Sequence, residues 1–304
     1  MAKKATQTIT LDGHAISLSS QDRVVFSDSG ITKGDVVAYY ADVAELMVPE
    51  LRGRALSMER FTKGIEAGGF FQKHWQKHYP DWIDSIEFGG KTVVRYPIVD
   101  TAAALVYFAN QGAIALHVIT SRKAALEHPD LVVFDLDPPE NGFELVRQTA
   151  RLLHDLLDEL GLRAFVKTTG SKGLHVVAPL DAKTTFDEVH TLCHAVSALM
   201  VARHPDLVTT EFYKAKRGGR LYFDVARNAL GSTFVAAYSL RGKPGAPVSM
   251  PIAWKDVDDK KLRSDAFTLK NVRQRIDKHG DPWRDLRKHA GSVAKAIKAL
   301  AKLA

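Results

Sequence analysis

The sequence predicts an α/β fold in which helices flank mixed, largely antiparallel sheets. Short apolar runs typical of strands alternate with longer runs whose apolar residues recur at helical spacing, which is the pattern of a layered protein. A tight loop joins the strand-like runs 164–168 and 174–179, so these two strands must pair as an antiparallel hairpin. A purely parallel sheet is therefore excluded.

The elements follow in order along the chain. Predicted strands cover residues 55–60, 92–96, 113–119, 131–137, 164–168, 174–179 and 220–225. The first predicted helix begins at Thr32, a good N-cap, and ends at Met47, with its apolar residues on one face. Further helices are predicted over 101–110, 143–160 and 186–203. The lysine-rich tail 285–304 is typical of a surface helix.

The composition narrows the class of protein. With 304 residues and 45% apolar content, the chain can bury a sizeable core. Its 42 Lys and Arg outnumber 35 Asp and Glu, and the net charge of +7 suits a polyanionic partner. The single cysteine, Cys193, excludes an intrachain disulfide framework. A signal peptide and a membrane-spanning stretch are both missing, so we expect a cytoplasmic protein without a membrane partner.

Acidic residues on two strand-like runs indicate a metal site. Asp135 and Asp137 are two residues apart on one predicted strand, so both carboxylates point to the same face. Carboxylates that close repel each other unless a cation neutralises them, and Mg²⁺ or Mn²⁺ prefers such oxygen ligands. Asp224, on a later strand, is the candidate third ligand. Taken alone, the Asp-Leu-Asp pair followed by Pro138-Pro139 is more often a turn at a strand end.

The loop of the predicted hairpin, Thr168-Thr-Gly-Ser-Lys-Gly, offers hydroxyls, backbone N–H groups and the ammonium of Lys172, which suits a polyphosphate. His175 follows directly. The loop is not a P-loop, because Gly-x-x-x-x-Gly-Lys is missing and no helix follows it. By itself it is usually only a turn. In order with the acidic residues on either side, it predicts a triphosphate cradle beside a metal site.

Two further features are ambiguous when read alone. Phe70 and Phe71 are consecutive, so a regular element cannot bury both in one core, and the common structural interpretation of such a pair is a loop anchor. An exposed ring beside Lys73 would instead form a platform on which bases stack. His117 lies in an apolar run, where a histidine is most often a hydrogen-bonded core residue.

Taken together, these motifs resemble the polymerase domain of bacterial DNA ligase D, a member of the archaeo-eukaryotic primase superfamily that serves non-homologous end joining. The resemblance runs nearly from end to end. It rests on Asp22-Arg-Val-Val-Phe, Gly30-Ile-Thr-Lys-Gly-Asp, Gly69-Phe-Phe-Gln-Lys-His, Phe134-Asp-Leu-Asp-Pro, Thr168-Thr-Gly-Ser-Lys-Gly-Leu-His, Ala237-Tyr-Ser-Leu-Arg and Asp281-Pro-Trp.

The resemblance implies a single primase-polymerase-type domain over 1–304, with an N-terminal DNA-contacting subregion 1–110, a catalytic core 111–255 and a helical tail 256–304. It implies a DNA-directed DNA/RNA polymerase that adds NTPs or dNTPs to a primer 3′-hydroxyl with two Mn²⁺ or Mg²⁺ ions, filling gaps and extending ends. The implied partners are DNA ends, gapped or 5′-phosphorylated duplex DNA, a Ku-like end-binding protein and a DNA ligase. The implied location is the cytoplasm, in association with the nucleoid.

The same resemblance assigns site residues. The implied metal ligands are Asp135, Asp137 and Asp224. The implied nucleotide-binding residues are Phe71, His117, Thr169, Ser171, Lys172, His175, Arg217 and Arg241, and the implied DNA and 5′-phosphate contacts are Arg23, Lys33, Arg60 and Phe70. Two positions depart from the family pattern. Thr169 stands where serine is common, and Glu59 stands where some relatives carry a basic residue, so Arg60 would supply that charge.

Other classes of protein share parts of the pattern. A haloacid-dehalogenase-type phosphatase also uses Asp-x-Asp after an apolar strand, with the first Asp as the nucleophile. A glycosyltransferase binds a metal and a nucleotide diphosphate with the same pair. A non-catalytic DNA-end-binding module would keep Arg23, Lys33 and Phe70 but would have no use for three carboxylates.

Overall fold

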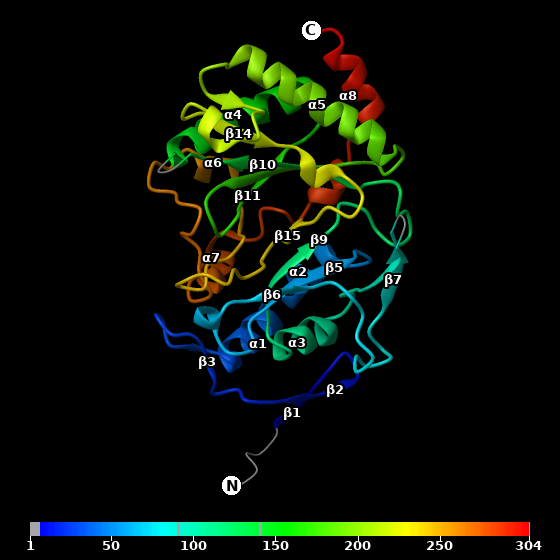
Figure 1. Ribbon diagram of the computed structural model, residues 1–304, viewed down its shortest axis with the longest axis vertical. Helices are drawn as coiled ribbons and strands as arrows, with labels where there is room; N and C mark the ends of the chain where they lie inside the picture. The colour runs from blue at the N-terminus through cyan, green and yellow to red at the C-terminus, as the bar shows by residue number, and fades with distance from the viewer. Residues whose placement is uncertain (1–6, 90–91, 140–141, 304) are drawn as a thin grey trace. The chain divides into compact units, whose positions relative to one another are not determined.

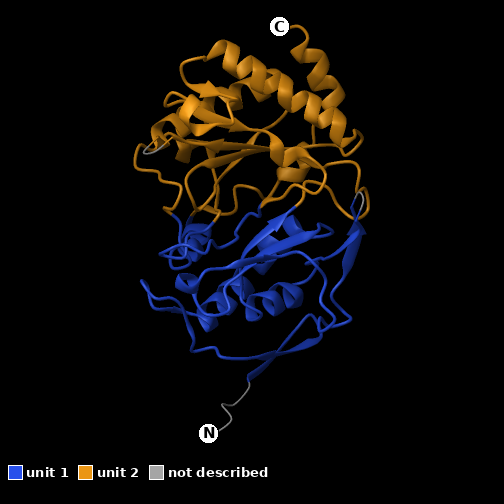
Figure 2. Ribbon diagram, viewed as in Figure 1, with its two compact units in different colours: residues 1–118, 235–248, 267–278 blue, residues 119–234, 249–266, 279–304 orange. Residues whose placement is uncertain are grey.

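The computed structural model describes residues 7–89, 92–139 and 142–303, and the chain folds as two compact units (Figure 2). Unit 1 comprises residues 1–118, 235–248 and 267–278, and unit 2 comprises 119–234, 249–266 and 279–304. Each unit has its own sheets and helices. The pairing is mostly antiparallel, so the predicted α/β class with mixed sheets is confirmed.

Unit 2 is built on a six-stranded sheet. The strand order is β13 (Val208–Thr209), β14 (Leu221–Asp224), β10 (Leu131–Asp137), β12 (Leu174–Pro179), β11 (Phe165–Thr168) and β16 (Pro251–Ile252). Only β13 and β14 pair in parallel among these neighbours. The helices and 3₁₀ turns are α4 (Phe143–Glu159), α5 (Phe186–Arg203), α6 (Trp254–Val257), α8 (Val293–Leu300), η2 (Lys214–Lys216), η3 (Ala226–Asn228) and η4 (Leu286–His289).

One face of this sheet forms the core of unit 2. Helix α4 lies against β10 and β12, and α8 lies against α5 (Figure 1). The residues that alternate with the acidic ones, Phe134 and Leu136 on β10 and Phe223 on β14, are at most 1% exposed. The rings of Phe134 and Phe223 lie 5.6 Å apart. The opposite face of the sheet is therefore the one that carries Asp135.

Unit 1 contains a second sheet, in the order β15 (Phe234–Val235), β9 (Ala113–Val118), β5 (Leu56–Arg60) and β6 (Phe70–Gln72). Its helices and 3₁₀ turn are α1 (Lys33–Asp42), α2 (Ala44–Leu51), α3 (Ala102–Asn110), α7 (Val272–His279) and η1 (Ile65–Ala67). Three two-stranded pairs complete it: β1 (Gln7–Leu11) with β2 (His14–Leu18), β3 (Val24–Phe26) with β4 (Ile31–Thr32), and β7 (Ser85–Phe88) with β8 (Val94–Pro97).

Two predicted helices differ from the structure. Thr32 is the N-cap of α1 as expected, but the helix predicted to end at Met47 is two helices that break at Val43. The apolar spacing continues across this buried residue, so the pattern does not reveal the break. The tail predicted as one helix over 285–304 is helical only in α8, after η4. The chain is extended at Gly291, whose amide donates to Pro179 O at 2.8 Å.

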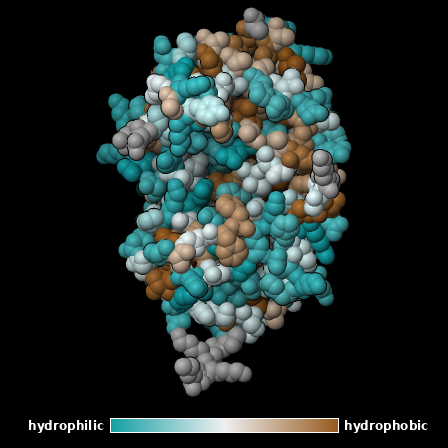
Figure 3. All heavy atoms as spheres, viewed as in Figure 1, coloured by the Kyte–Doolittle hydropathy of each residue, from teal (hydrophilic) through white to brown (hydrophobic). Residues whose placement is uncertain are grey.

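Within the described part of the chain, no helix is both long enough and apolar enough to cross a membrane. The face of the molecule in Figure 3 is mainly hydrophilic, with hydrophobic residues gathered in small groups.

Candidate active site

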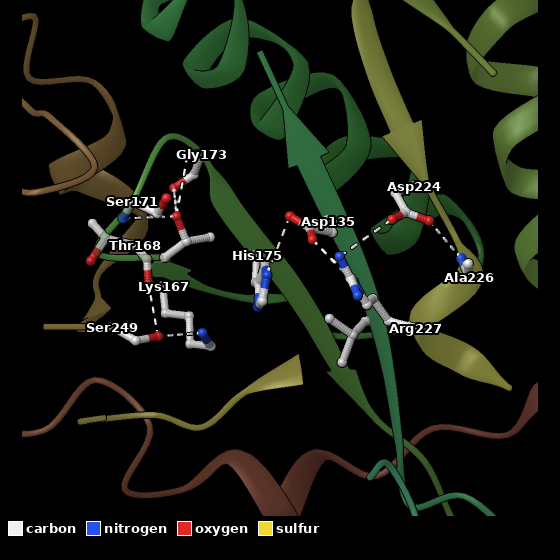
Figure 4. Close-up of polar contacts among 12 residues, drawn as sticks. Asp135, Lys167, Thr168, Ser171, Gly173, His175, Asp224, Ala226, Arg227 and Ser249 are labelled. Carbon is white, nitrogen blue, oxygen red and sulfur yellow. Dashed lines mark hydrogen bonds and ion pairs between the residues drawn. The ribbon is translucent and has the colours of Figure 1, made fainter. Parts of the chain in front are cut away.

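Four polar side chains form a row across the sheet of unit 2. Asp224 on β14 lies opposite Asp135 on β10, which lies opposite His175 on β12, which lies opposite Lys167 on β11. Directly opposed residues of antiparallel strands share a face, so the four side chains project from one side (Figure 4). Each is nearly buried, with 8% or less of its surface exposed.

Asp137 lies on the same face of the sheet as this row, because it follows Asp135 by two residues on β10. Its partner on β14 is Tyr222. Burial raises its pKa, and the negative charges of Asp135 and Asp224 raise it further. The register of β10 with β14 places the three carboxylates near one another. Sheet register thus brings together the three acidic residues that the sequence singled out.

Arg227 lies among these carboxylates and was missed by the sequence reasoning. Its Nε lies 3.2 Å from Asp135 Oδ2, and a terminal nitrogen lies 3.6 Å from Asp224 Oδ2. Burial would raise the pKa of Asp135, but His175 and Arg227 outweigh it and hold that pKa well below its usual range. The available signal was an arginine three residues after Asp224, the spacing of a 3₁₀ turn.

Turn η3 fixes the position of Arg227. The Ala226 amide donates to Asp224 Oδ1 at 2.8 Å. Buried Asn228 accepts from the Val133 amide at 2.8 Å and donates to Val133 O at 2.7 Å. These bonds tie η3 to the backbone of β10, so the guanidinium is held beside the carboxylates.

His175 is neutral in this site. Burial lowers its pKa to about 4, and the charge of Lys167 contributes. Its Nε2 lies 3.3 Å from Asp135 Oδ1, so we assign the single ring proton to Nε2. The other nitrogen, Nδ1, is buried without a hydrogen-bond partner among the described residues. Lys167 is fully buried, and its Nζ donates to Ser249 Oγ at 2.5 Å.

The loop between β11 and β12 is held closed by Thr169. Its hydroxyl accepts from the amides of Ser171 and Gly173, each at 3.2 Å, and donates to Gly173 O at 3.1 Å. Gly173 passes so close to β10 that a Cβ there would lie 2.0 Å from Leu136 O. Only glycine therefore allows the loop to sit against the strand that carries Asp135.

A cavity of about 410 Å³ opens beside this loop. Ser171 and Lys172 line it from the loop, Pro138 from the end of β10, and Arg263 from the segment before α7. The Lys172 side chain is exposed, so its ammonium is available to an anion entering the cavity. Arg263 pairs with Asp265 at 3.2 Å.

Arg217 approaches the acidic face from the other side. It donates to the carbonyl oxygens of Glu211 and Phe212 at 3.0 and 2.8 Å. Its guanidinium lies 4.1 Å from the ring centroid of Tyr222. Because Tyr222 is the residue opposite Asp137, Arg217 places a positive charge beside the carboxylates.

The aromatic candidates gather on the sheet of unit 1. Phe70 and Phe71 on β6 lie opposite Arg60 and Glu59 on β5. Both rings are exposed, at 49% and 63%, because β6 is an edge strand. The ring of Phe71 contacts His117 edge to face at 5.5 Å. Both consecutive aromatic side chains are thus exposed to solvent, not one.

The basic candidates of unit 1 differ in how many of their hydrogen-bond donors already have partners within the protein. Arg60 donates from Nε to Gln111 O at 2.9 Å and from another nitrogen to Gln72 Oε1 at 2.5 Å. Burial raises the pKa of Glu59, while the charge of Arg241 opposes that rise.

Arg23 and Lys33 form a cationic pair. Burial lowers the pKa of Lys33 to about 8, and the neighbouring charge of Arg23 contributes. Lys33 Nζ donates to Ser19 O at 2.5 Å, and Arg23 donates to Thr62 O at 2.5 Å. Arg23 Nε is buried without a partner among the described residues. An anion bound here would relieve the repulsion between the two cations.

The candidate residues therefore fall into two sets. Unit 2 carries Asp135, Asp137, Thr169, Ser171, Lys172, His175, Arg217 and Asp224, and unit 1 carries Arg23, Lys33, Arg60, Phe70, Phe71, His117 and Arg241.

A model of one protein family matches most of the chain. The family is described as "LigD, primase-polymerase domain", and the match covers residues 32–283. The chain belongs to this family.

Individual members support the LigD assignment. The chain is 33% identical over 276 residues to the multifunctional non-homologous end joining DNA repair protein LigD of Mycobacterium tuberculosis, covering 88% of this chain and 36% of that protein. It is 32% identical over 277 residues to LigD of Pseudomonas aeruginosa, covering 89% of this chain and 32% of that protein. The chain thus spans about a third of the length of these relatives.

A solved structure matches the fold as well. It is the polymerase domain from Mycobacterium tuberculosis ligase D in complex with DNA, with a TM-score of 0.86 and 32% sequence identity. The match covers 91% of this chain and 99% of that domain.

LigD primase-polymerase domains are in general metal-dependent nucleotidyltransferases. The three carboxylates are the oxygen donors that hard divalent cations take, so the chemistry of the donor set fits. As the side chains lie, no group of three or more His, Cys, Asp or Glu residues in the described part of the chain is arranged to hold an ion. Asp135 and Asp224 are instead paired with Arg227.

Proposed function

We propose that this chain is a nucleotidyltransferase of DNA end joining, which adds NTPs or dNTPs to a primer 3′-hydroxyl to fill gaps and extend ends. One observation carries the proposal. Asp135, Asp137 and Asp224 share a face of the sheet in a chain of the LigD primase-polymerase family. The loop with Thr169 lies against the same strand as two of these acids.

The three carboxylates would hold two Mg²⁺ or Mn²⁺ ions. Such ions, when bound, supply the charge that activates the attacking hydroxyl and neutralises the leaving pyrophosphate. The protein's own contribution is to bring the three acids together before the ions arrive. Arg227 must release Asp135 and Asp224 for this to happen, and its half-exposed guanidinium can swing towards solvent.

The triphosphate would bind at the loop between β11 and β12. Lys172 and Arg217 supply positive charge on two sides of the acidic face, and Ser171 supplies a backbone N–H and a hydroxyl. His175 has a different role, because its pKa of about 4 leaves it uncharged at neutral pH. Its Nε2–H orients Asp135 instead of neutralising phosphate.

Unit 1 would supply the remaining nucleotide and DNA contacts. Phe71, His117 and Arg241 would contact the incoming nucleotide, and Phe70 would stack on a base. Arg23 and Lys33 would receive a 5′-phosphate, while Arg60, whose donors bind Gln111 and Gln72, would contribute charge at longer range. DNA ends, a Ku-like protein and a ligase as partners, and a cytoplasmic, nucleoid-associated location, belong to the same proposal.

The test is extension of a labelled primer on a gapped, 5′-phosphorylated duplex with Mn²⁺ or Mg²⁺ and each NTP or dNTP. Asp137→Ala should abolish extension and leave DNA affinity nearly unchanged, because that residue contacts ions and not the duplex. DNA affinity of the wild type should fall steeply with salt. Normal extension by the variant would refute the acidic site. Phosphomonoester hydrolysis without extension would favour a phosphatase, and binding without extension would favour a non-catalytic end-binding module.

A further inference from the structure

The segment between β13 and β14 carries the two most exposed large hydrophobic side chains of the described residues. Phe212 is 70% exposed and Tyr213 is 65% exposed. They stand at the start of the sequence Glu211-Phe-Tyr-Lys-Ala-Lys-Arg-Gly-Gly-Arg220, which has four basic residues and one acid. Two adjacent exposed rings in a strongly basic segment are unusual for a purely structural loop, because structural aromatic residues are normally buried.

The two rings are held in a defined arrangement. They meet edge to face, with centroids 5.6 Å apart and planes at 83°. The Tyr213 amide donates to Glu211 Oε1 at 3.0 Å, and Arg217 bonds the carbonyl oxygens of Glu211 and Phe212. Arg220 Nε donates to Arg217 O at 2.8 Å. The segment is braced from within, so binding would cost little further ordering.

The aromatic pair lies next to the acidic face of the same unit. The Phe212 ring lies 6.4 Å from that of Tyr222, and Tyr222 is the residue opposite Asp137. Basic groups accompany the rings, since Lys216 Nζ lies 5.6 Å from the Tyr213 ring. A ligand stacked on the pair would therefore lie close to the acidic face.

We propose that Phe212 and Tyr213 form a stacking site for unpaired bases of single-stranded DNA, with Lys214 and Lys216 contacting the backbone. Because the ring planes are nearly perpendicular, the two rings offer faces to different bases. Base stacking on aromatic rings tolerates any sequence, and the positive charge complements the phosphates. The proposal rests on the proposed polymerase function, which supplies a reason for an unpaired strand beside the acidic face.

The experiment compares two labelled single strands of equal length, an oligothymidylate and an abasic oligomer, by fluorescence anisotropy. The double variant Phe212→Ala/Tyr213→Ala should lose at least about fivefold in affinity for the oligothymidylate and nothing for the abasic strand. The matched control is Leu230→Ala, another exposed hydrophobic residue of unit 2, 45% exposed, which should bind both strands as the wild type does. Unfolding temperatures should be unchanged, because the removed side chains are exposed.

Salt dependence separates stacking from charge. The double aromatic variant should keep the wild-type slope of log affinity against log salt, whereas Lys214→Ala and Lys216→Ala should each reduce the slope by about 0.7. Equal losses on the base-bearing and abasic strands, or no loss on either, would overturn the stacking site. A change in self-association of the double variant, with DNA binding intact, would overturn it in favour of a protein contact.

The two proposals can fail separately. If the wild type extends primers but the double variant binds the oligothymidylate normally, the stacking inference is wrong and the polymerase function stands. If the wild type never extends a primer but the double variant still binds the oligothymidylate more weakly than the wild type does, the stacking site stands and the proposed reaction is wrong.

Discussion

Arg227 neutralises part of the acidic face. If divalent ions take its place there, as we propose, removing its charge should destabilise mainly the metal-free protein. We consider Arg227→Met, which keeps most of the aliphatic stem. The guanidinium makes two contacts, at 3.2 Å to Asp135 and 3.6 Å to Asp224, and its side chain is 40% exposed. Because solvent screens a pair this exposed, each contact contributes no more than about 1 kcal/mol.

The expected loss is therefore at most about 2 kcal/mol of unfolding free energy in EDTA. The assay is thermal unfolding of wild type and variant in EDTA and in saturating Mn²⁺, where roughly 2–4 °C corresponds to each kcal/mol for a chain of this size class. In Mn²⁺ the difference should shrink or reverse, because ions bound as proposed would neutralise the carboxylates in both proteins. Arg203→Met is the matched control. It removes a surface contact of 3.2 Å to Glu159, and its effect should not depend on metal.

An equal loss of stability in EDTA and in Mn²⁺ would refute the reasoning, since it would mean that Arg227 and the ions do not compete. A metal-dependent difference in Arg203→Met would show that the readout reports a general effect of Mn²⁺ instead.

Four further predictions concern Lys33, Phe71 and Gly173. Lys33 is charged below its pKa of about 8, so the preference for 5′-phosphorylated over 5′-hydroxyl duplex should fall as the pH rises from 7 to 9; an anisotropy ratio that stays flat would exclude Lys33 from that contact. Since the same pKa is near 10.5 when unfolded, Lys33 itself should contribute increasing stability as pH rises between 8 and 10.5, which denaturant titrations at several pH values would measure as the difference between wild type and Lys33→Met. Phe71→Ala should raise the KM for nucleotide and change the unfolding free energy by less than about 0.5 kcal/mol. The control is Phe61→Ala, which removes a ring that is 3% exposed and should cost about 3–5 kcal/mol of unfolding free energy. Equal stability losses in the two variants would contradict the surface role of Phe71. Gly173→Ala should impair both stability and primer extension, because its Cβ would lie 2.0 Å from Leu136 O; wild-type unfolding and extension rates would show that the loop moves away at no cost.

The strands that carry the candidate site could be predicted because their sequence signals are local. Strand β10 ends just before Pro138, and β12 begins after Gly173 and ends at Pro179, so both have the predicted bounds. The period of two places Asp135 and Asp137 on one face without knowledge of the partner strands. That Asp224 lies opposite Asp135 depends on strand register, which the sequence alone does not provide.

Other parts of the site depend on contacts between distant segments. Arg227 reaches the carboxylates because Asn228 ties its turn to β10, and no pattern in the sequence reveals that bond. Lys167 looks like an exposed residue of an amphipathic strand, yet it is fully buried, where Ser249 Oγ accepts a hydrogen bond from its ammonium group. The resemblance to ligase D polymerases named Thr169, but only the structure shows that its hydroxyl closes the loop.

The division of the chain into units also lies beyond sequence patterns. Residues 235–248 and 267–278 return to unit 1 after the chain has formed most of unit 2. Composition and periodicity do not change at these crossings, since the segments are short and are held by contacts with residues far away in the sequence.

The central claim is that the three carboxylates on one face of the sheet carry out nucleotidyl transfer. The most direct measurement is the single-turnover rate of primer extension on a gapped, 5′-phosphorylated duplex, for wild type, Asp224→Asn and Asp206→Asn. Asp206 is an exposed acid of the same unit, so its variant makes the same change of charge away from the row. The account predicts loss of extension in Asp224→Asn and a wild-type rate in Asp206→Asn. Extension at the wild-type rate by Asp224→Asn, or no extension by the wild type with either metal, would contradict it.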